Sequence, residues 1–379
     1  MKKFLAFILS LSMVIVVPAQ IVYAKDNKKS EPTAKSSVLM CLETGDVIKE
    51  NNSHERLSPA SVTKIMSILL IIESIDSGKI KLDDMVSASE NAVSKGGSQI
   101  WLEVGEKMSV NDLLKAVIIA SANDACTLLG EYIAGSDSAF VDMMNKKCRE
   151  LGLKDTNFEN CTGLDDEVTN HYSSAYDLAV IAREVMKHDL VTEYSTVWLD
   201  SLRNGETELN NTNKLVNTYS GITGLKTGTT SNAGFCLCAT AKRDNMGLVS
   251  VVLGADNSED RFSLSSQLLD YGFANYKLEK LNVDKKKIKS VKVKNGVIKS
   301  IKPAVSNQEY VLMEKSSSEV TCKYNAKKEL HAPVKKGDKI GEIVYYSDSK
   351  KIASISLNAD CDIKKTSFSY ILKQLFKYM

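Results

Sequence analysis

The sequence lacks the cysteine pattern of a metal site. Its eight cysteines include no C-x-x-C pair, and Cys236 and Cys238 alternate with apolar residues as on a buried strand. A C-x-C pair on a strand suits a tetrahedral zinc site poorly, whereas buried thiols pack as small hydrophobes. We therefore expect no metal and no cofactor. Free structural thiols would suit a reducing or anaerobic environment.

The chain also lacks a surplus of charge of one sign. Its 379 residues carry 49 basic and 47 acidic side chains, and loss of Lys2 and Lys3 with the N-terminal segment would leave a formal charge of zero. A protein that binds nucleic acid without sequence preference usually has a clear basic surplus. We therefore expect no nucleic-acid partner.

The apolar run at the N-terminus, Phe4 to Val17, is short for a membrane span. It follows two lysines and leads to Val22-Tyr23-Ala24, a pattern typical of a secretory signal peptide with a small residue at the cleavage site. The sequence therefore predicts a signal peptide at 1–24, a polar linker at 25–35 and an exported protein.

The order of predicted strands and helices indicates an α+β fold for residues 36–274. Strands are predicted at 37–43, 234–241 and 247–253, with turn sequences at 44–46 and 244–245. Helical patterns cover 62–75, 110–120, 125–134, 138–151, 173–187 and 258–271. Strands at both ends with helices between them predict an antiparallel sheet flanked by helices.

The composition changes near residue 275. Residues 277–302 contain ten lysines and two acidic residues, interleaved with Val and Ile at period two, and turn sequences divide the rest into short strands. This pattern predicts a second, smaller all-β domain at 275–362. Its lysines would suit an anionic polymer, but a solvated strand face is the more common origin of such a pattern.

The last segment, 363–379, has apolar residues at helical spacing. They are Phe368, Ile371, Leu372, Leu375, Phe376 and Met379, with lysines near or opposite them. An amphipathic helix of this kind lies on a membrane surface or packs on its own domain. Its position after an exported body favours the membrane, so we expect peripheral attachment to the outer face of the cytoplasmic membrane, with a secreted protein as the alternative.

A serine and a lysine lie three residues apart where the apolar helix at 62–75 begins. Ser58 can cap this helix, and Pro59 suits its first position. Residues three apart share a helix face, so Lys64 can accept the proton of the Ser61 hydroxyl, a weak nucleophile without a base. A charged lysine is costly to bury among apolar residues, so either the pKa of Lys64 should fall or its side chain should be heavily hydrogen-bonded. The free N–H of Ser61 in the first turn can stabilise an oxyanion.

Two further motifs contain polar residues, one at a predicted corner between two helices and one before a predicted strand. Ser121-Ala122-Asn123 falls between two predicted helices, where its side chains either face a cleft or cap the next helix. Lys226-Thr227-Gly228 precedes the strand at 234. On an edge strand Gly228 would let a substrate backbone approach closely, beside the cation of Lys226 and the hydroxyl of Thr227. A flexible Gly/Thr turn is the alternative.

Together, in this order and setting, the three motifs resemble those of the low-molecular-mass penicillin-binding proteins of the D-alanyl-D-alanine carboxypeptidase family, the type-5 group. The resemblance covers nearly the whole chain. It includes the leader, the stretch from Gly97 to Asp124, Gly163-Leu164 with His171 and Asp177, Gly221 to Thr230, Arg261 before Tyr271-Gly272-Phe273, the β domain and the amphipathic end. It implies the penicillin-binding, serine β-lactamase-like transpeptidase fold.

The resemblance implies the chemistry of the first two motifs. Ser61 would attack the penultimate D-alanine carbonyl of a peptidoglycan pentapeptide stem and release the terminal D-alanine, and water would hydrolyse the acyl-enzyme. Lys64 would be the base, Ser121 would relay protons and Asn123 would hold the substrate amide. Beta-lactam antibiotics would acylate Ser61 as mimics of this substrate.

The resemblance also implies how the substrate is held. The backbone N–H groups of Ser61 and Thr229 would form the oxyanion hole. Lys226, Thr227 and Gly228 would line the site, and Arg261 would attract the terminal carboxylate. Ala122 is a small departure, because many relatives have glycine there.

Several alternatives differ in chemistry. A class A β-lactamase shares S-x-x-K and K-T-G, but its second motif is usually S-D-N, and Glu206 lies too close to Lys226 to be its deacylating glutamate. A His-based serine hydrolase is disfavoured because the sequence has no G-x-S-x-G. A non-catalytic wall-binding protein would have no reason to retain Lys64 in an apolar helix. A transpeptidase or endopeptidase remains open, because the motifs do not report the acyl acceptor.

Overall fold

The computed structural model describes residues 32–166, 168–306 and 310–377. The predicted signal peptide (1–24) and most of the predicted linker lie outside the described residues. Within these three ranges, the structure contains no helix with the length and hydropathy needed to span a membrane.

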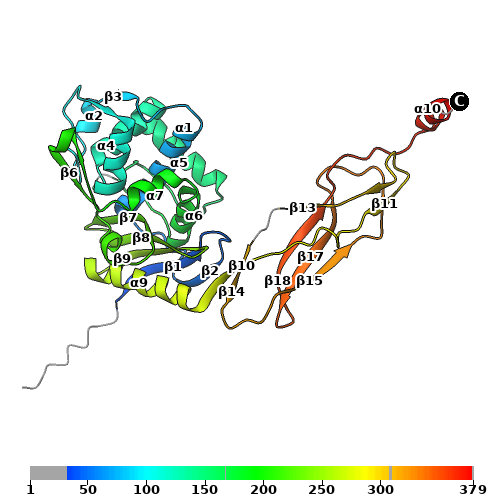
Figure 1. The fold of residues 1–379 in the computed structure, drawn as a ribbon. Helices are drawn as coiled ribbons and strands as arrows, with labels where there is room; N and C mark the ends of the chain where they lie inside the picture. Colours follow the sequence, from blue (N-terminus) through cyan, green and yellow to red (C-terminus); the bar gives the residue numbers. More distant parts are fainter. Residues whose placement is uncertain (1–31, 167, 307–309, 378–379) are drawn as a thin grey trace, which may run out of the picture. The chain divides into compact units, whose positions relative to one another are not determined.

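A five-stranded antiparallel sheet organises residues 32–275, in the order β2-β1-β9-β8-β7 (Figure 1). Its strands are β1 (Ala34–Cys41), β2 (Val47–Asn51), β7 (Ile222–Thr230), β8 (Gly234–Arg243) and β9 (Met246–Ala255). β1, from the start of the domain, pairs with β9, from its end, so the sheet joins distant parts of the chain. β7 is an edge strand, as expected if the Lys226 motif lies along an open side of the sheet.

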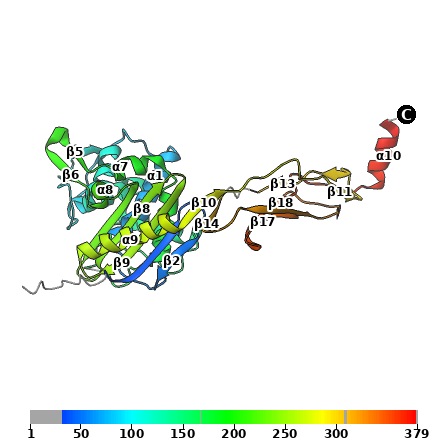
Figure 2. The ribbon, with the colours of Figure 1, turned by 60° about the horizontal axis from the view of Figure 1, so that its bottom comes forward.

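The central strands are buried on both faces. In β1, Val38 and Met40 enter one core while Leu39 and Cys41 enter the other, because successive side chains of a strand point to opposite sides. The second core is closed by the apolar side of α9 (Ser258–Asn275), which covers one face of the sheet (Figures 1 and 2). The first core is larger and lies between the sheet and the other helices.

The side chains of α1 (Lys64–Asp76) are buried nearly all round, and α4, α5 and α6 pack against it among the remaining helices of this domain. Those remaining helices are α2 (Glu90–Val93), α3 (Val110–Lys115), α4 (Asn123–Ala134), α5 (Asp137–Glu150), α6 (Ala175–Val185), α7 (Asp189–Ser195) and α8 (Leu215–Thr218). Two small hairpins pair β3 (Met85–Ser87) with β4 (Lys107–Ser109) and β5 (Leu199–Leu202) with β6 (Thr207–Asn210). The predicted α+β arrangement of an antiparallel sheet flanked by helices is confirmed.

The start of α1 differs from the prediction. Residues Ala60–Thr63 form a 3-10 turn, η1, and regular helix begins only at Lys64. Ser58 does not cap this helix, because its hydroxyl donates instead to Asp165 Oδ2 at 3.0 Å. Pro59 precedes the first turn rather than occupying it. The expected cap is therefore wrong, and Ser58 ties the turn to a distant loop.

Residues 276–365 form the predicted smaller all-β domain. Its strands are β10 (Tyr276–Lys280), β11 (Val291–Lys294), β12 (Ser300–Ile301), β13 (Ala304–Val305), β14 (Tyr310–Glu314), β15 (Thr321–Ala326), β16 (Glu329–His331), β17 (Lys339–Ser347) and β18 (Lys350–Asn358). They form three sheets, β10-β14, β12-β11-β16 and β13-β18-β17-β15. Two small apolar clusters, one around Ile343 and Ile355 and one around Val293 and Ile340, hold these sheets together.

The C-terminal helix is shorter than the predicted segment at 363–379. Ile363 belongs to the β domain, where it is 1% exposed and bridges to Val334. Helix α10 covers Phe368–Lys377. Phe368 is 80% exposed and Phe376 68% exposed, so at least part of its apolar side does not pack on described residues.

A tight backbone contact fixes the loop at 160–165 against η1. Gly163 has φ +84°, and a Cβ atom there would lie 1.8 Å from the carbonyl oxygen of Ala60. No rotamer change can relieve such a clash, because both partners are backbone. The loop can therefore approach the turn only through a glycine.

We expect Gly163→Ala to lower the free energy of unfolding by at least about 3 kcal/mol, because it adds a backbone clash to a left-handed residue. Gly78→Ala is the matched control: Gly78 also has positive φ (+71°) but nothing lies within 4 Å of its Cβ position. Left-handed strain alone should cost the control about 1 kcal/mol. Urea denaturation measures both losses, and equal losses would contradict the close contact.

Candidate active site

The 3-10 turn η1 presents Ser61 at the start of α1. Ser61 is half-buried, whereas Ala60, Val62 and Thr63 around it are fully buried and anchor the turn in the core. The Lys64 ammonium donates a hydrogen bond to the Ser61 hydroxyl at 3.0 Å. The predicted pairing of these two residues on one side of the helix start is thus present in the structure.

Lys64 is completely buried and has three oxygen acceptors. Besides Ser61, its Nζ donates to Asn123 Oδ1 at 2.5 Å and to the carbonyl oxygen of Thr162 at 2.8 Å. All three acceptors are formally neutral, so burial dominates and lowers the pKa of Lys64 from 10.5 to about 8. This drop corresponds to about 3 kcal/mol. A lysine with this pKa has an appreciable neutral fraction near neutral pH and can accept a proton.

The second motif lies at a corner, as predicted. Residues Ala116–Ala120 form a π-helical turn, η2, that ends at Ser121, whose backbone is left-handed with φ +65°. The corner directs Asn123, the first residue of α4, toward Lys64, and Asn123 Nδ2 donates to the Gly96 carbonyl at 2.7 Å. The buried Ser121 hydroxyl forms no hydrogen bond to Ser61 or Lys64 in the part of the chain that the structure describes.

The third motif lies in strand β7, not in a flexible turn. Lys226 is completely buried, and its ammonium has one acceptor among the described residues, the Thr227 carbonyl at 3.3 Å. Burial, and then the positive charges of Lys64 and Arg261, lower the pKa of Lys226 well below its usual value. The Thr227 hydroxyl donates to that of Thr212 at 2.7 Å. An anionic group reaching Lys226 would therefore meet an amine with unused donors, and its negative charge would favour the protonated form.

The structure explains the glycine at position 228 differently from the prediction. A Cβ atom there would lie 2.8 Å from the Pro59 carbonyl oxygen and 2.9 Å from the Ser61 backbone nitrogen. The close approach is made by η1, the turn that contains Ser61, and by Pro59 before it. Because η1 and β7 touch at Gly228, the N–H groups of Ser61 and Thr229, predicted to form an oxyanion hole, come from adjoining segments.

Arg261 of α9 supports β7 from behind. It is 8% exposed, and its guanidinium donates to the Gly228 carbonyl at 3.0 Å and to the Thr229 hydroxyl at 2.9 Å. The rings of Phe235 and Phe262 lie 5.4 and 4.9 Å from the guanidinium carbon. Burial lowers the pKa of Arg261, although it remains a cation. Because the guanidinium is buried, a ligand in the site would meet the exposed Thr229, which Arg261 contacts, rather than Arg261 itself.

The loop at 160–165 contains contacts that the sequence motifs did not reveal. Asn160 Oδ1 accepts hydrogen bonds from the N–H groups of Thr162, at 3.1 Å, and Gly163, at 2.7 Å, and this turn aims the Thr162 carbonyl at Lys64. Asp165 Oδ2 accepts from the hydroxyls of Ser58, at 3.0 Å, and Thr230, at 2.6 Å. Asp165 thus links the segment that leads into η1 to β7. Sequence alone offered only the Gly163-Leu164 pair as a signal.

A buried histidine contacts η1 and is not part of a catalytic triad. His171 is 6% exposed, and its Nδ1 accepts from the Glu159 N–H at 3.1 Å. Its Nε2 therefore carries the proton and donates to the Thr63 hydroxyl at 2.8 Å. Burial lowers the pKa of His171 to about 4, so the ring is neutral and its role is to position η1.

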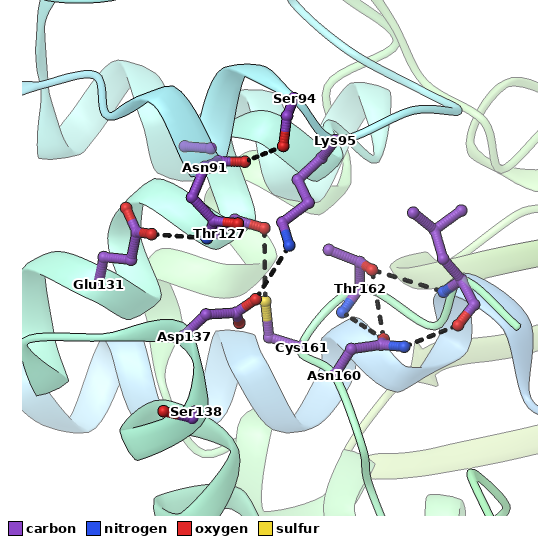
Figure 3. A network of polar contacts seen from close by, with 12 residues as sticks. Asn91, Ser94, Lys95, Thr127, Glu131, Asp137, Ser138, Asn160, Cys161 and Thr162 are labelled. Atoms are coloured by element: carbon purple, nitrogen blue, oxygen red, sulfur yellow. Dashed lines mark hydrogen bonds and ion pairs between the residues drawn. The ribbon is translucent and has the colours of Figure 1, made fainter. Parts of the chain in front are cut away.

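A hollow of about 490 Å³ is lined in part by Lys95, Gly96, Asp137 and Thr162. It shares Gly96 and Thr162 with the contacts just described. Figure 3 shows Lys95 reaching toward Asp137, with which it forms an ion pair at 3.1 Å, beside Thr127 and Cys161. Thr127 and Cys161 are themselves buried. The hollow therefore adjoins residues that hold Lys64 and Asn123 in place.

No cluster of three or more residues suited to a metal ion is found among the described residues. All eight cysteines are free thiols, six of them buried, and Cys236 and Cys238 point into the core beneath β8. Hydrogen bonds and close backbone approaches bring most of the predicted site residues into one region of the domain. They are Ser61, Lys64, Asn123, Lys226, Thr227, Gly228 and Thr229. This arrangement of a serine, a lysine with lowered pKa and two adjoining N–H groups is suited to acyl transfer.

Comparisons with known proteins agree with this geometry. A family model described as D-alanyl-D-alanine carboxypeptidase matches residues 23–257, and one described as penicillin-binding protein 5, C-terminal domain, matches residues 276–365. The chain is 41% identical over 382 residues to D-alanyl-D-alanine carboxypeptidase DacF of Bacillus subtilis (strain 168), with coverage of 99% of this chain and 98% of the relative.

Solved structures show the same similarity. Penicillin-binding protein 5 from Haemophilus influenzae is similar with a TM-score of 0.80 and 35% identity, over 88% of this chain and 98% of that chain. Penicillin-binding protein D2 from Listeria monocytogenes, solved with ampicillin bound, is similar over 63% of this chain and 97% of that chain, with 29% identity and a TM-score of 0.56.

The link through Asp165 can be tested by a double-mutant cycle on stability. Asp165→Ala and Thr230→Val each remove one side of the 2.6 Å hydrogen bond, so we expect a coupling free energy of about 1 kcal/mol or more between them. Asp166→Ala with Thr230→Val is the matched control, and this pair should show no coupling beyond about 0.3 kcal/mol. Thermal and urea unfolding measure both cycles, and equal coupling would disprove the link.

Proposed function

The chain belongs to the D-alanyl-D-alanine carboxypeptidase family of serine penicillin-binding enzymes, and from this we propose how its own residues carry out the reaction. The family acts on peptidoglycan peptides and binds β-lactams, so the protein is a serine-type D-Ala-D-Ala carboxypeptidase. We assign Ser61 as its nucleophile and Lys64 as the base. The observation that supports this assignment most directly is the 3.0 Å hydrogen bond from the buried Lys64 to Ser61.

In the proposed first step, neutral Lys64 takes the proton of Ser61 as the hydroxyl oxygen attacks the carbonyl carbon of the penultimate D-alanine. The negative charge on the carbonyl oxygen is stabilised by the N–H groups of Ser61 and Thr229. The proton then passes to the leaving amine, with Ser121 as the relay, and the terminal D-alanine departs. A water molecule attacks the ester on Ser61, which regenerates the hydroxyl and releases the shortened peptide.

The charges around the site support one orientation of the substrate. The terminal carboxylate lies toward Lys226, Thr227 and Thr229, where it also relieves the unfavourable burial of the Lys226 charge. Arg261 attracts the carboxylate from behind Thr229. Asn123 holds the amide on the other side of the scissile bond, and the stem continues toward the hollow at Lys95 and Asp137.

Removal of the nucleophile should abolish turnover. We expect residues 25–379 to release D-alanine from a synthetic peptide ending in D-Ala-D-Ala, and Ser61→Ala to reduce kcat at least about a thousandfold. Ser77→Ala, at an exposed serine after α1, is the control and should be unaffected. A quantitative assay of free D-alanine measures this, and undiminished release by Ser61→Ala would refute the assignment.

The same assay separates hydrolysis from transfer. When an amino acid acceptor is added, a carboxypeptidase gives mostly the shortened peptide, whereas a transpeptidase gives mostly the exchanged product. Dominant exchange at acceptor concentrations far below that of water would assign the main activity to transpeptidation instead.

We also propose that the protein is exported and is held at the outer face of the cytoplasmic membrane by α10. The N-terminal pattern at 1–24 supports export, and the exposed Phe368, Ile371, Leu372 and Phe376 support attachment. An amphipathic helix lies in the membrane interface and does not need the length of a spanning helix.

Attachment through α10 predicts a specific loss of vesicle binding. Phe368→Gln with Phe376→Gln should weaken binding to phosphatidylglycerol vesicles about 100-fold or more, because two aromatic side chains no longer enter the interface. Ser369→Gln, at an exposed polar position in the first turn of the same helix, is the control. A chain ending at Thr366 keeps Ile363 in the β domain and should not bind. Vesicle flotation measures all three, and retained binding by the truncated chain would contradict the proposal.

A further inference from the structure

The formal charge of the chain is divided unequally between its two domains. Residues 25–275 carry 24 basic and 36 acidic side chains, a formal charge of −12. Residues 276–365 carry 21 lysines and 11 acidic side chains, a formal charge of +10. The balance of the whole chain therefore hides a strongly basic β domain. A surplus of this size over about ninety residues produces a positive potential that attracts polyanions.

Four of these lysines surround one hollow of about 510 Å³. Lys287 and Lys289 come from the segment before β11, and Lys327 and Lys328 from the connection between β15 and β16. All four are exposed, and the residues that line the hollow, as far as the chain is described, include no Asp or Glu. The cations thus come from two segments that are separated in sequence, which a single solvated strand face does not explain.

The nearby carboxylates are already engaged with other partners. Glu329, next to Lys328 in sequence, pairs with Lys294 at 2.8 Å and with His331 at 3.4 Å. Asp284 accepts the N–H of Lys286 at 2.9 Å. None of the four lysines around the hollow forms an ion pair with any residue that the structure describes. A bound polyanion would pair with these lysines and release the cations condensed on it.

The hollow also offers a neutral donor and an apolar floor. Tyr324 accepts the N–H of Asp284 at 2.9 Å, which leaves the proton of its hydroxyl available to a ligand. Ile288, Val291 and Leu357 line the floor and are nearly fully buried. Ammonium groups with a hydroxyl donor suit phosphate oxygens, and the apolar floor suits the carbon spacer between two phosphates.

We propose that this hollow of the β domain is a binding site for a phosphodiester polymer, with Lys287, Lys289, Lys327 and Lys328 as its cationic ligands. A chain-like polyanion fits better than a membrane, because a flat lipid surface does not enter a concave site. The site is separate from the residues assigned to catalysis, and it would hold the enzyme on an anionic polymer near its substrate.

The test uses residues 25–379 and fluorescently labelled poly(glycerol phosphate) at about 0.15 M salt. Replacement of the four lysines by glutamine should weaken binding roughly 30-fold or more and reduce the slope of log affinity against log salt by about 3. The matched control replaces four other lysines of the same domain by glutamine, with the same loss of charge. They are Lys299, Lys302, Lys350 and Lys351. It should weaken binding by less than about threefold.

A variant with arginine at the four positions retains the charge and should retain binding, which shows that the site requires the positive charge and not the lysine side chain itself. D-alanine release should be unchanged in every variant, so failure here is distinguishable from failure of the proposed catalytic function. Equal weakening by the two glutamine variants, or no binding by the unmodified chain, would overturn the site.

Vesicles test the competing occupant. In the Phe368→Gln/Phe376→Gln background, which removes the contribution of α10, the four lysines should make little difference to binding of phosphatidylglycerol vesicles. If they account for vesicle binding while the polymer is not bound by any variant, the surface docks on lipid and the polymer proposal is wrong.

Discussion

The burial of the Lys64 ammonium beneath three neutral oxygen acceptors is the constraint on which the rest of the site depends. A charged lysine in a core is unfavourable, and neutral acceptors compensate only part of the lost hydration. The remaining penalty favours the neutral amine, which is the form that can activate Ser61. Each acceptor comes from a different segment, η1, α4 and the loop at 160–165, so the lysine also fixes these segments relative to one another.

Close backbone approaches make this convergence possible. Gly163 brings the loop onto Ala60, and Gly228 brings β7 onto Pro59 and Ser61. Asp165 then joins the same turn to Thr230 of β7 through two hydroxyl groups. The nucleophile therefore lies on a short 3-10 turn that is held from several sides, which supplies the fixed geometry that acyl transfer requires. Glycine is required at both positions because a side chain there would overlap other protein atoms, and not because the backbone must be flexible.

Much of this could be predicted from the sequence, because the informative patterns are local. The apolar helix after Ser61, the strands at 234–253 and the corner at Ser121 follow from periodicity and turn residues, and the family resemblance is confirmed by the comparisons. The contacts of Asp165 and the Thr162 carbonyl could not be predicted, since they join residues about a hundred positions apart. Ser58 was misassigned as a cap for the same reason: its true partner is distant in sequence. The basic charge of the β domain follows from its composition, whereas the position of four of its lysines around one hollow depends on the fold.

The most direct test of the account is a titration of Lys64 itself. In protein with 13C-labelled lysine side chains, NMR follows the Cε and Hε signals of Lys64, assigned by their absence in Lys64→Met. The structure predicts a midpoint of about 8 for Lys64, below the roughly 10.4 of a lysine in a model peptide. The neutral amine should thus gain population as the pH rises through about 8, and acylation of Ser61 should rise with it. A midpoint of Lys64 within the range of the exposed lysines would contradict its role as the base.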